Sequence, residues 1–218
     1  MNKKNILLFG ANSYISKTFI RDYSKQYSIY PVYRKEVEQS LHIDFENSTD
    51  IKDFSEKISF PIDAILFLQG VNPTMGVADI TEEHFARMLK INLVTPVLLI
   101  RELKEKMSEH SAVIFFSSVS KRKGSYDPSY ASAKAGLVGL MHSLANAYPR
   151  QRFNLISLGL VEGSPVYDKM SEEFRAKHAE KMQNGSFIKP ENVAGVIHML
   201  INNSNINRSD IAIDGGYN

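Results

Sequence analysis

A tyrosine and a lysine stand four residues apart near the start of a predicted helix. Asp127-Pro128 is typical of a helix start, because aspartate caps helices and proline suits their first turn. Tyr130 and Lys134 then lie on one helix face. A tyrosine ordinarily has a pKa of about 10, which a neighbouring ammonium lowers by favouring the phenolate. The spacing therefore predicts a general acid/base, with two solvated surface residues as the alternative explanation.

Ser118 is the second candidate. Ser117-Ser118 ends the apolar run Val113–Phe116, which is typical of a buried strand. Parallel α/β sheets bind their ligands at the carboxyl ends of strands. We therefore expect the Ser118 hydroxyl to hydrogen-bond the substrate oxygen that Tyr130 protonates.

Asn92 interrupts the apolar stripe of a long predicted helix over residues 79–108. A buried amide costs stability unless it is hydrogen-bonded. Asn92 is therefore either a functional group or a repair of the helix ladder that Pro96 disturbs, and the sequence alone leaves both open. The stripe consists of Phe85, Met88, Leu89, Leu99, Leu103 and Met107.

A turn of small residues follows the first apolar run, Ile6–Phe9. A helix is expected to begin directly after the turn Gly10-Ala11-Asn12-Ser13. Backbone N–H groups at such a turn can bind a phosphate. Tyr14 and Ser16 occupy the later positions of the usual glycine pattern, so the turn alone is weak evidence for a dinucleotide.

Short apolar runs alternate with longer amphipathic segments along the whole chain. Such runs indicate strands covered on both faces, so the alternation predicts one doubly wound α/β domain over residues 1–218. We expect a parallel sheet of about seven strands with helices on both faces. Only about seven residues separate Tyr33 from Leu41, so a crossover helix is expected to be missing after the second strand. The other strands are expected at Ile29–Tyr33, Leu41–Ile43, Ile65–Leu68, Leu155–Leu158 and Ile211–Ile213, and the helices near 14–26, 48–58, 79–108, 128–147, 168–182 and 190–203.

Composition narrows the chemistry further. The 218 residues include no cysteine, which excludes disulfides and thiolate chemistry. The six histidines show no paired ligand spacing, so we predict no metal site. Basic and acidic residues are balanced, 26 against 24, and nucleic acid is not an expected partner. Without a long apolar run, we expect no signal peptide and no membrane span, and hence a cytoplasmic protein.

Taken together, the motifs resemble those of the short-chain dehydrogenase/reductase family, in family order along nearly the whole chain. The resemblance implies a Rossmann-type fold, a nicotinamide cofactor and a catalytic tetrad of Asn92, Ser118, Tyr130 and Lys134. The matching segments are Gly10-Ala11-Asn12-Ser13, His42-Ile43-Asp44-Phe45, Asn92-Leu93, Ser117-Ser118-Val119, Tyr130 through Leu137, Asn154 through Gly159, and Asp214-Gly215-Gly216.

The resemblance also implies a role for each member of the tetrad. Tyr130 is the general acid/base, and Ser118 polarises the substrate oxygen. Lys134 lowers the tyrosine pKa and holds the nicotinamide ribose, and Asn92 positions a water molecule. Asp44 matches the position whose side chain contacts the adenine. The expected cofactor contacts are Gly10, Asn12, Ser13, Tyr14, Ile15, Arg34, Asp44, Phe45, Gln69, Gly70, Tyr130, Lys134, Gly159 and Val161.

Several departures from the family pattern fall on the cofactor side. Tyr14 and Ser16 replace two glycines of the turn. Phe67-Leu68-Gln69-Gly70 stands where Asn-Asn-Ala-Gly is usual, and Leu158-Gly159 replaces Pro-Gly.

Arg34 points to NADP as the cofactor, with NAD as the second possibility. In such folds the residue at the end of the second strand contacts the adenosine ribose. This chain has Arg34 and Lys35 there, and an arginine can hold a 2′-phosphate with two hydrogen bonds. Solvated loop residues are the alternative explanation.

The sequence thus predicts an NAD(P)-dependent oxidoreductase acting on a small carbonyl or alcohol substrate. A non-catalytic protein that senses a dinucleotide is the alternative, because two glycines of the cofactor turn are replaced. A carbohydrate epimerase is less compatible, because those chains usually carry an added substrate lobe.

Two expectations concern partners. A homodimer or homotetramer is expected, because the Tyr130 helix carries small residues that allow another helix to approach. An anionic substrate is a weaker expectation, resting on the basic run Lys121-Arg122-Lys123 between Ser118 and Tyr130. A solvated loop is the simpler explanation of that run. The small residues are Ala131, Ala133, Ala135, Gly136 and Gly139.

Overall fold

Seven parallel strands form the sheet in the computed structural model, which describes residues 3–36, 40–47, 49–71 and 75–217. Their order, β3-β2-β1-β4-β5-β6-β7, confirms the doubly wound prediction. The order reverses between β1 and β4, and ligands bind beside such a reversal. The strands are β1 (Lys4–Phe9), β2 (Tyr27–Tyr33), β3 (Leu41–His42), β4 (Ile62–Phe67), β5 (Met107–Ser118), β6 (Arg152–Leu158) and β7 (Asp210–Ile213).

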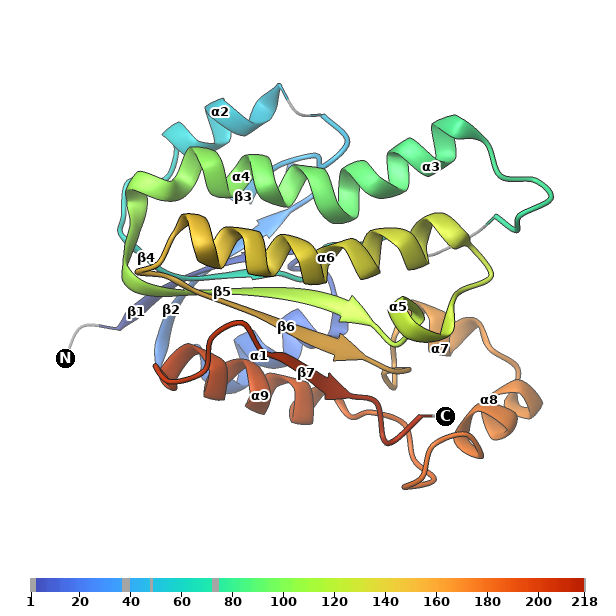
Figure 1. Cartoon of the computed structure of the whole chain (residues 1–218). Helices are drawn as coiled ribbons and strands as arrows, with labels where there is room; N and C mark the ends of the chain where they lie inside the picture. Colours follow the sequence, from blue (N-terminus) through green and yellow to red (C-terminus); the bar gives the residue numbers. More distant parts are fainter. Residues whose placement is uncertain (1–2, 37–39, 48, 72–74, 218) are drawn as a thin grey trace.

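Helices cover both faces of the sheet (Figure 1). One face carries α2 (Asp50–Glu56), α4 (Thr95–Leu103) and α6 (Pro128–Ala147), and the other carries α1 (Tyr14–Tyr23) and α9 (Pro190–Asn202). α3 (Glu82–Leu89) runs into α4. Three short helices lie near the carboxyl ends of the strands, namely α5 (Ser120–Lys123), α7 (Pro165–Lys169) and α8 (Glu172–Ala179).

Aromatic residues at the centre of the sheet explain one departure from the family pattern. Phe67 is buried and stacks between Phe9 of β1 and Phe115 of β5, with ring centres 5.1 and 5.3 Å apart. Stacked rings of this kind add to the stability that burial provides. Phe67 therefore serves the core rather than the cleft.

The long helix expected over residues 79–108 is divided. α3 continues through a π-helical turn, Lys90–Val94, into α4, and a 3₁₀ turn at Lys104–Lys106 ends it. Pro96 lacks an N–H, and the Thr95 N–H binds the carbonyl of Lys90, five residues back. Met107, expected on the helix stripe, instead begins β5. Its apolar side chain suits either a helix or a strand, so the helix predicted over residues 79–108 extends too far toward the C-terminus.

Other boundaries differ more modestly. No helix joins β2 to β3 within the described residues 34–36 and 40, as the short spacing predicts, and residues 37–39 lie outside the description. The helix expected at 168–182 is two short helices, because Ser171 caps the second of them. α5 was not predicted. Among the described residues, no helix has the length and apolar character to cross a membrane.

Candidate active site and cofactor cleft

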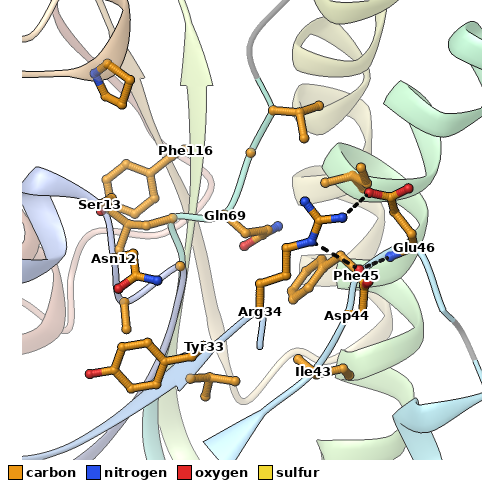
Figure 2. A pocket seen from close by; sticks show the side chains of 18 of the residues that line it. Asn12, Ser13, Tyr33, Arg34, Ile43, Asp44, Phe45, Glu46, Gln69 and Phe116 are labelled. Carbon is orange, nitrogen blue, oxygen red and sulfur yellow. Dashed lines mark hydrogen bonds and ion pairs between the residues drawn. The ribbon is translucent and has the colours of Figure 1, made fainter. Parts of the chain in front are cut away.

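A cleft of about 440 Å³ opens beside the point where the strand order reverses. Its volume lies within the usual range for small-molecule sites. The turn after β1, the end of β2 and the segments after β3 and β4 form its walls (Figure 2). Tyr130 and Lys134 of α6 also line it. It brings together ten of the predicted cofactor contacts: Gly10, Asn12, Ser13, Arg34, Asp44, Phe45, Gln69, Gly70, Tyr130 and Lys134.

Four predicted cofactor contacts do not line this cleft in the part of the chain described. Ile15 is buried in the core under the sheet. Val161 is buried and pairs with Ile188, and Gly159 packs against Ile188 and Asp214. The fourth, Tyr14, is considered below.

Gly10 makes the turn after β1 possible. Its φ is +79°, and a Cβ added there would lie 2.6 Å from backbone atoms of Leu68 and Gln69. The turn therefore requires glycine at this position. The first strand and the segment after β4 can approach each other only because this side chain is absent.

Ser16 compensates for the glycine it replaces. Its side chain is fully buried, and its Oγ donates to the carbonyl of Gly10 at 2.9 Å. The two hydroxyls of Ser13 and Ser16 lie 2.7 Å apart, and Ser13 caps α1 by accepting from the Ser16 N–H. The two hydroxyl groups thus cap the start of α1 and hold the turn that precedes it. This support for the turn was not predicted from the sequence.

Tyr14 turns away from the cleft. Its side chain is 53% exposed, and its ring lies against Gly163, near the start of α7. A Cβ on Gly163 would approach the ring to 3.1 Å. The tyrosine therefore replaces a loop glycine without filling the space in which a phosphate would lie.

A buried aspartate fixes the start of α6, as the Asp127-Pro128 pattern predicts. Asp127 Oδ1 accepts from the N–H groups of Ser129 and Tyr130 at 3.0 and 3.3 Å. Its Oδ2 lies 2.6 Å from Nε2 of His84 on α3. Tyr130 is therefore held in place by two helices. His84 was missed because only the fold brings it to Asp127.

Ser118 and Tyr130 come together at the end of β5, as expected. Burial raises the pKa of Tyr130 above its ordinary value, and a hydrogen bond with Ser118 opposes that change. The spacing of Tyr130 and Lys134 predicts a lowered pKa, which is the opposite direction. The net direction is upward because burial outweighs the hydrogen bond, so the phenol is protonated and suited to donate a proton at neutral pH.

Lys134 is almost completely buried behind Tyr130. Its Nζ donates to the carbonyl of Phe116 at 2.8 Å and lies 5.6 Å from the centre of the Tyr130 ring. Burial lowers the pKa of Lys134 to about 8. The ammonium is thus close enough to favour a phenolate once Tyr130 has given up its proton.

Asn92 repairs the irregular helix with one end of its amide, and its functional role stays a prediction. Its Nδ2 donates to the carbonyl of Met88 at 3.0 Å within the irregular helix. Its buried Oδ1 has no protein partner and lies 3.5 Å from where a Cβ on Gly70 would be. That position is also 3.9 Å from Nζ of Lys134. The amide repairs the helix and still presents an acceptor beside Lys134.

The cleft fits a nicotinamide dinucleotide by its own features. A glycine turn and the start of α1 lie at one wall, where N–H groups can receive phosphates. Two buried acceptors, Gln69 Oε1 and Asn92 Oδ1, have no protein partner, and buried polar atoms normally have one. Tyr130 and Lys134 of α6 line the same cleft.

Arg34 enters the cleft from the end of β2 (Figure 2). Its Nη2 donates to Glu46 at 2.6 Å, and its Nε lies 3.6 Å from Asp44 Oδ1. Arg87 of α3 binds the same Glu46 through two nitrogens. Neither Glu46 nor Arg87 was identified from the sequence, because the charges meet only after folding.

The basic run after β5 is occupied by partners from the C-terminal segment. Lys121 pairs with Asp210 and Ser157, Arg122 pairs with Asp214, and Lys123 lies over the ring of Tyr217. These contacts tie α5 to β7 and the segment after it, while Arg122 and Lys123 remain exposed to solvent. The anionic substrate stays a prediction.

Comparison with known proteins assigns the class. A family model described as enoyl-(acyl carrier protein) reductase matches residues 20–218. A 3-oxoacyl-[acyl-carrier-protein] reductase from Rickettsia conorii is 26% identical over 191 residues, covering 84% of this chain and 79% of the relative. One of the same name from Thermotoga maritima is 28% identical over 186 residues, covering 78% and 74%.

The fold comparison agrees. A short-chain dehydrogenase/reductase structure from Brucella melitensis has a TM-score of 0.88 at 18% identity, covering 98% of this chain and 96% of that one. A metagenomic blue fluorescent protein in complex with NADPH has a TM-score of 0.85 at 17% identity, covering 99% and 98%. A 4-hydroxyisoleucine dehydrogenase complexed with NADH has a TM-score of 0.83 at 22% identity, covering 98% of each.

The chain belongs to the short-chain dehydrogenase/reductase family. It is accordingly an oxidoreductase of the class that uses a nicotinamide cofactor.

Proposed function

We propose that the protein transfers a hydride between a nicotinamide cofactor and a small carbonyl or alcohol substrate, with Tyr130 as the general acid/base. The observation that carries the proposal is that Tyr130 and Lys134 line the same cleft as the glycine turn, with Ser118 hydrogen-bonded to Tyr130. A dinucleotide would place its phosphates near Gly10, Asn12 and Ser13. When bound, the cofactor supplies or accepts the hydride.

The side chains then divide the proton chemistry. In the reduction direction, Ser118 and Tyr130 hydrogen-bond the substrate oxygen, and Tyr130 donates its proton as negative charge develops there. Lys134 stabilises the resulting phenolate electrostatically, because its ammonium lies near the ring in a water-poor setting. Asn92 holds an acceptor beside Lys134, where a water molecule can join the proton relay.

Turnover with carbonyl compounds tests this function. The relatives' names make 3-oxoacyl thioesters the first members of the panel, followed by simple ketones and aldehydes. The purified chain is mixed with each compound and either NADPH or NADH, and the absorbance of the reduced nicotinamide is followed. Consumption that depends on the carbonyl supports an enzyme. Tight cofactor binding with no turnover across the panel would favour the sensor alternative.

We propose that the cofactor is NADP(H) rather than NAD(H). Arg34 supports this, because it extends from the end of β2 into the cleft and its guanidinium can hold a phosphate with two hydrogen bonds. Calorimetric titration of the cofactor-free chain with NADPH and NADH tests the proposal. Tighter binding of NADH would overturn it.

We propose that the chain assembles into a homodimer or homotetramer through α6. Ala133 and Gly136 serve the chain's own packing, since Ala133 is buried and Gly136 lies against Leu93. Ala135 and Gly139 are exposed, and a Cβ on Gly139 would meet nothing within 4 Å. A monomer of 24.6 kDa in light scattering at micromolar concentration would overturn the proposal.

A further inference from the structure

Glu46 bridges two arginines at the wall of the cleft. Its Oε1 accepts from Arg34 Nη2 at 2.6 Å and from Arg87 Nη2 at 2.8 Å, and its Oε2 accepts from Arg87 Nε at 2.9 Å. Asp44 adds a second carboxylate to Arg34 at 3.6 Å. Figure 2 shows the Arg34 guanidinium inside the cleft, turned toward Asp44 and Glu46.

This arrangement sets a cost for any phosphate that binds Arg34. A phosphate that accepts two parallel hydrogen bonds from Arg34 competes with Glu46 for Nη2, and it then lies close to the Glu46 carboxylate. A ribose hydroxyl carries no charge and meets neither penalty. Glu46 therefore acts against a phosphorylated ribose and only weakly against an unphosphorylated one.

Arg87 acts in the opposite direction. It holds Glu46 with two parallel hydrogen bonds, the strongest geometry for such a pair. The Arg87 hydrogen bond is also the main reason that the pKa of Glu46 lies below its ordinary value. When Arg34 leaves, Glu46 thus remains paired and its charge remains compensated.

We propose that Glu46 and Arg87 set the preference of the cleft between NADPH and NADH. Glu46 holds Arg34 away from a phosphate, and Arg87 makes it easier for Arg34 to leave Glu46. The inference rests on the proposed nicotinamide cofactor, and it concerns the shift in preference that each side chain causes. Glu46→Gln should favour NADPH, and Arg87→Met should disfavour it. Once Glu46 is neutral, Arg87 has no charge to compensate, so its replacement should matter little.

The test is calorimetric titration of the cofactor-free protein with NADPH and with NADH, at one low salt concentration. Wild type, Glu46→Gln, Arg87→Met and the double variant form a cycle. Arg101→Met and Glu102→Gln are the matched controls, because they remove the same charges from an ion pair on α4 that does not line the cleft. Melting temperatures establish that each variant is folded.

We expect Glu46→Gln to raise the ratio of NADPH affinity to NADH affinity by about tenfold, which is about 1.4 kcal/mol. Arg87→Met should lower that ratio by about as much, but by less than about twofold in the Glu46→Gln background. Both controls should leave the ratio unchanged. NADH affinity should move little in any variant.

The inference is overturned if Glu46→Gln leaves or lowers the ratio, and this variant decides the question even if Arg87→Met is unstable. An equal loss from Arg87→Met in both backgrounds would also overturn it, since Arg87 would then act independently of Glu46. Failure of the proposed function looks different: a folded wild type would bind neither dinucleotide.

Discussion

Replacing Lys134 by methionine should stabilise the cofactor-free protein at neutral pH while removing the ammonium beside Tyr130. Burial lowers the pKa of Lys134 to about 8, whereas a lysine in an unfolded chain has a pKa of about 10.4. The gap corresponds to a cost of about 3 kcal/mol for keeping the charged group buried at pH 7. Methionine removes that cost but leaves the Phe116 carbonyl without its donor, a loss of about 1–2 kcal/mol. The net expected gain is about 1–2 kcal/mol.

The dependence of this gain on pH is the sharper test. Between pH 8 and about 10.4 the unfolded wild-type chain binds more protons than the folded one, so its free energy of unfolding rises with pH in that window. The advantage of Lys134→Met should therefore shrink by about 2 kcal/mol between pH 7 and 9.5. Urea unfolding at both values measures it. Lys106→Met, which loses an ammonium bonded to the carbonyls of Ser55 and Ile58, controls for the lost hydrogen bonds. A stability difference between wild type and Lys134→Met that does not change with pH would refute the reasoning.

Three further substitutions probe other parts of the structure. Arg34→Asp should raise the KM for NADPH at least about tenfold and improve the use of NADH, and unchanged steady-state constants would contradict this. His84→Phe should lower the free energy of unfolding by about 1–3 kcal/mol, because buried Asp127 loses a hydrogen bond, and it should reduce kcat more than it changes the cofactor KM. Unchanged thermal unfolding would argue against this role for His84. Arg152→Met should cost about 2–4 kcal/mol in urea unfolding, because the side chain donates to the carbonyls of Leu200, Ile201, Asn203 and Ile206 near the end of α9. A loss below about 1 kcal/mol would show that water replaces those bonds.

Local patterns predicted the elements well where one interpretation was physically dominant. Continuous apolar runs identified six of the seven strands because parallel strands are buried on both faces. The Asp127-Pro128 pair located the first residue of α6, since the cap and the proline act locally. Met107 was misplaced because an apolar residue suits a helix stripe and a strand equally.

What could not be predicted depends on contacts between distant segments. The three cations after β5 are adjacent in sequence, but their partners Asp210, Asp214 and Tyr217 lie about ninety residues away. Glu46 lies 12 residues from Arg34 and 41 residues from Arg87, so these ion pairs too form only once the chain has folded. The pKa of Tyr130 was predicted in the wrong direction because a nearby charge can be seen in the sequence, whereas the depth of burial cannot.

Tyr130→Phe tests the central assignment most directly, because it removes only the hydroxyl group. With a carbonyl substrate from the panel, kcat should fall at least ~10²-fold, the contribution expected of a general acid/base. Calorimetric NADPH binding should stay within about threefold of wild type, since the aromatic ring and Lys134 remain in place. A variant that retains near wild-type kcat would contradict the assignment of proton transfer to Tyr130.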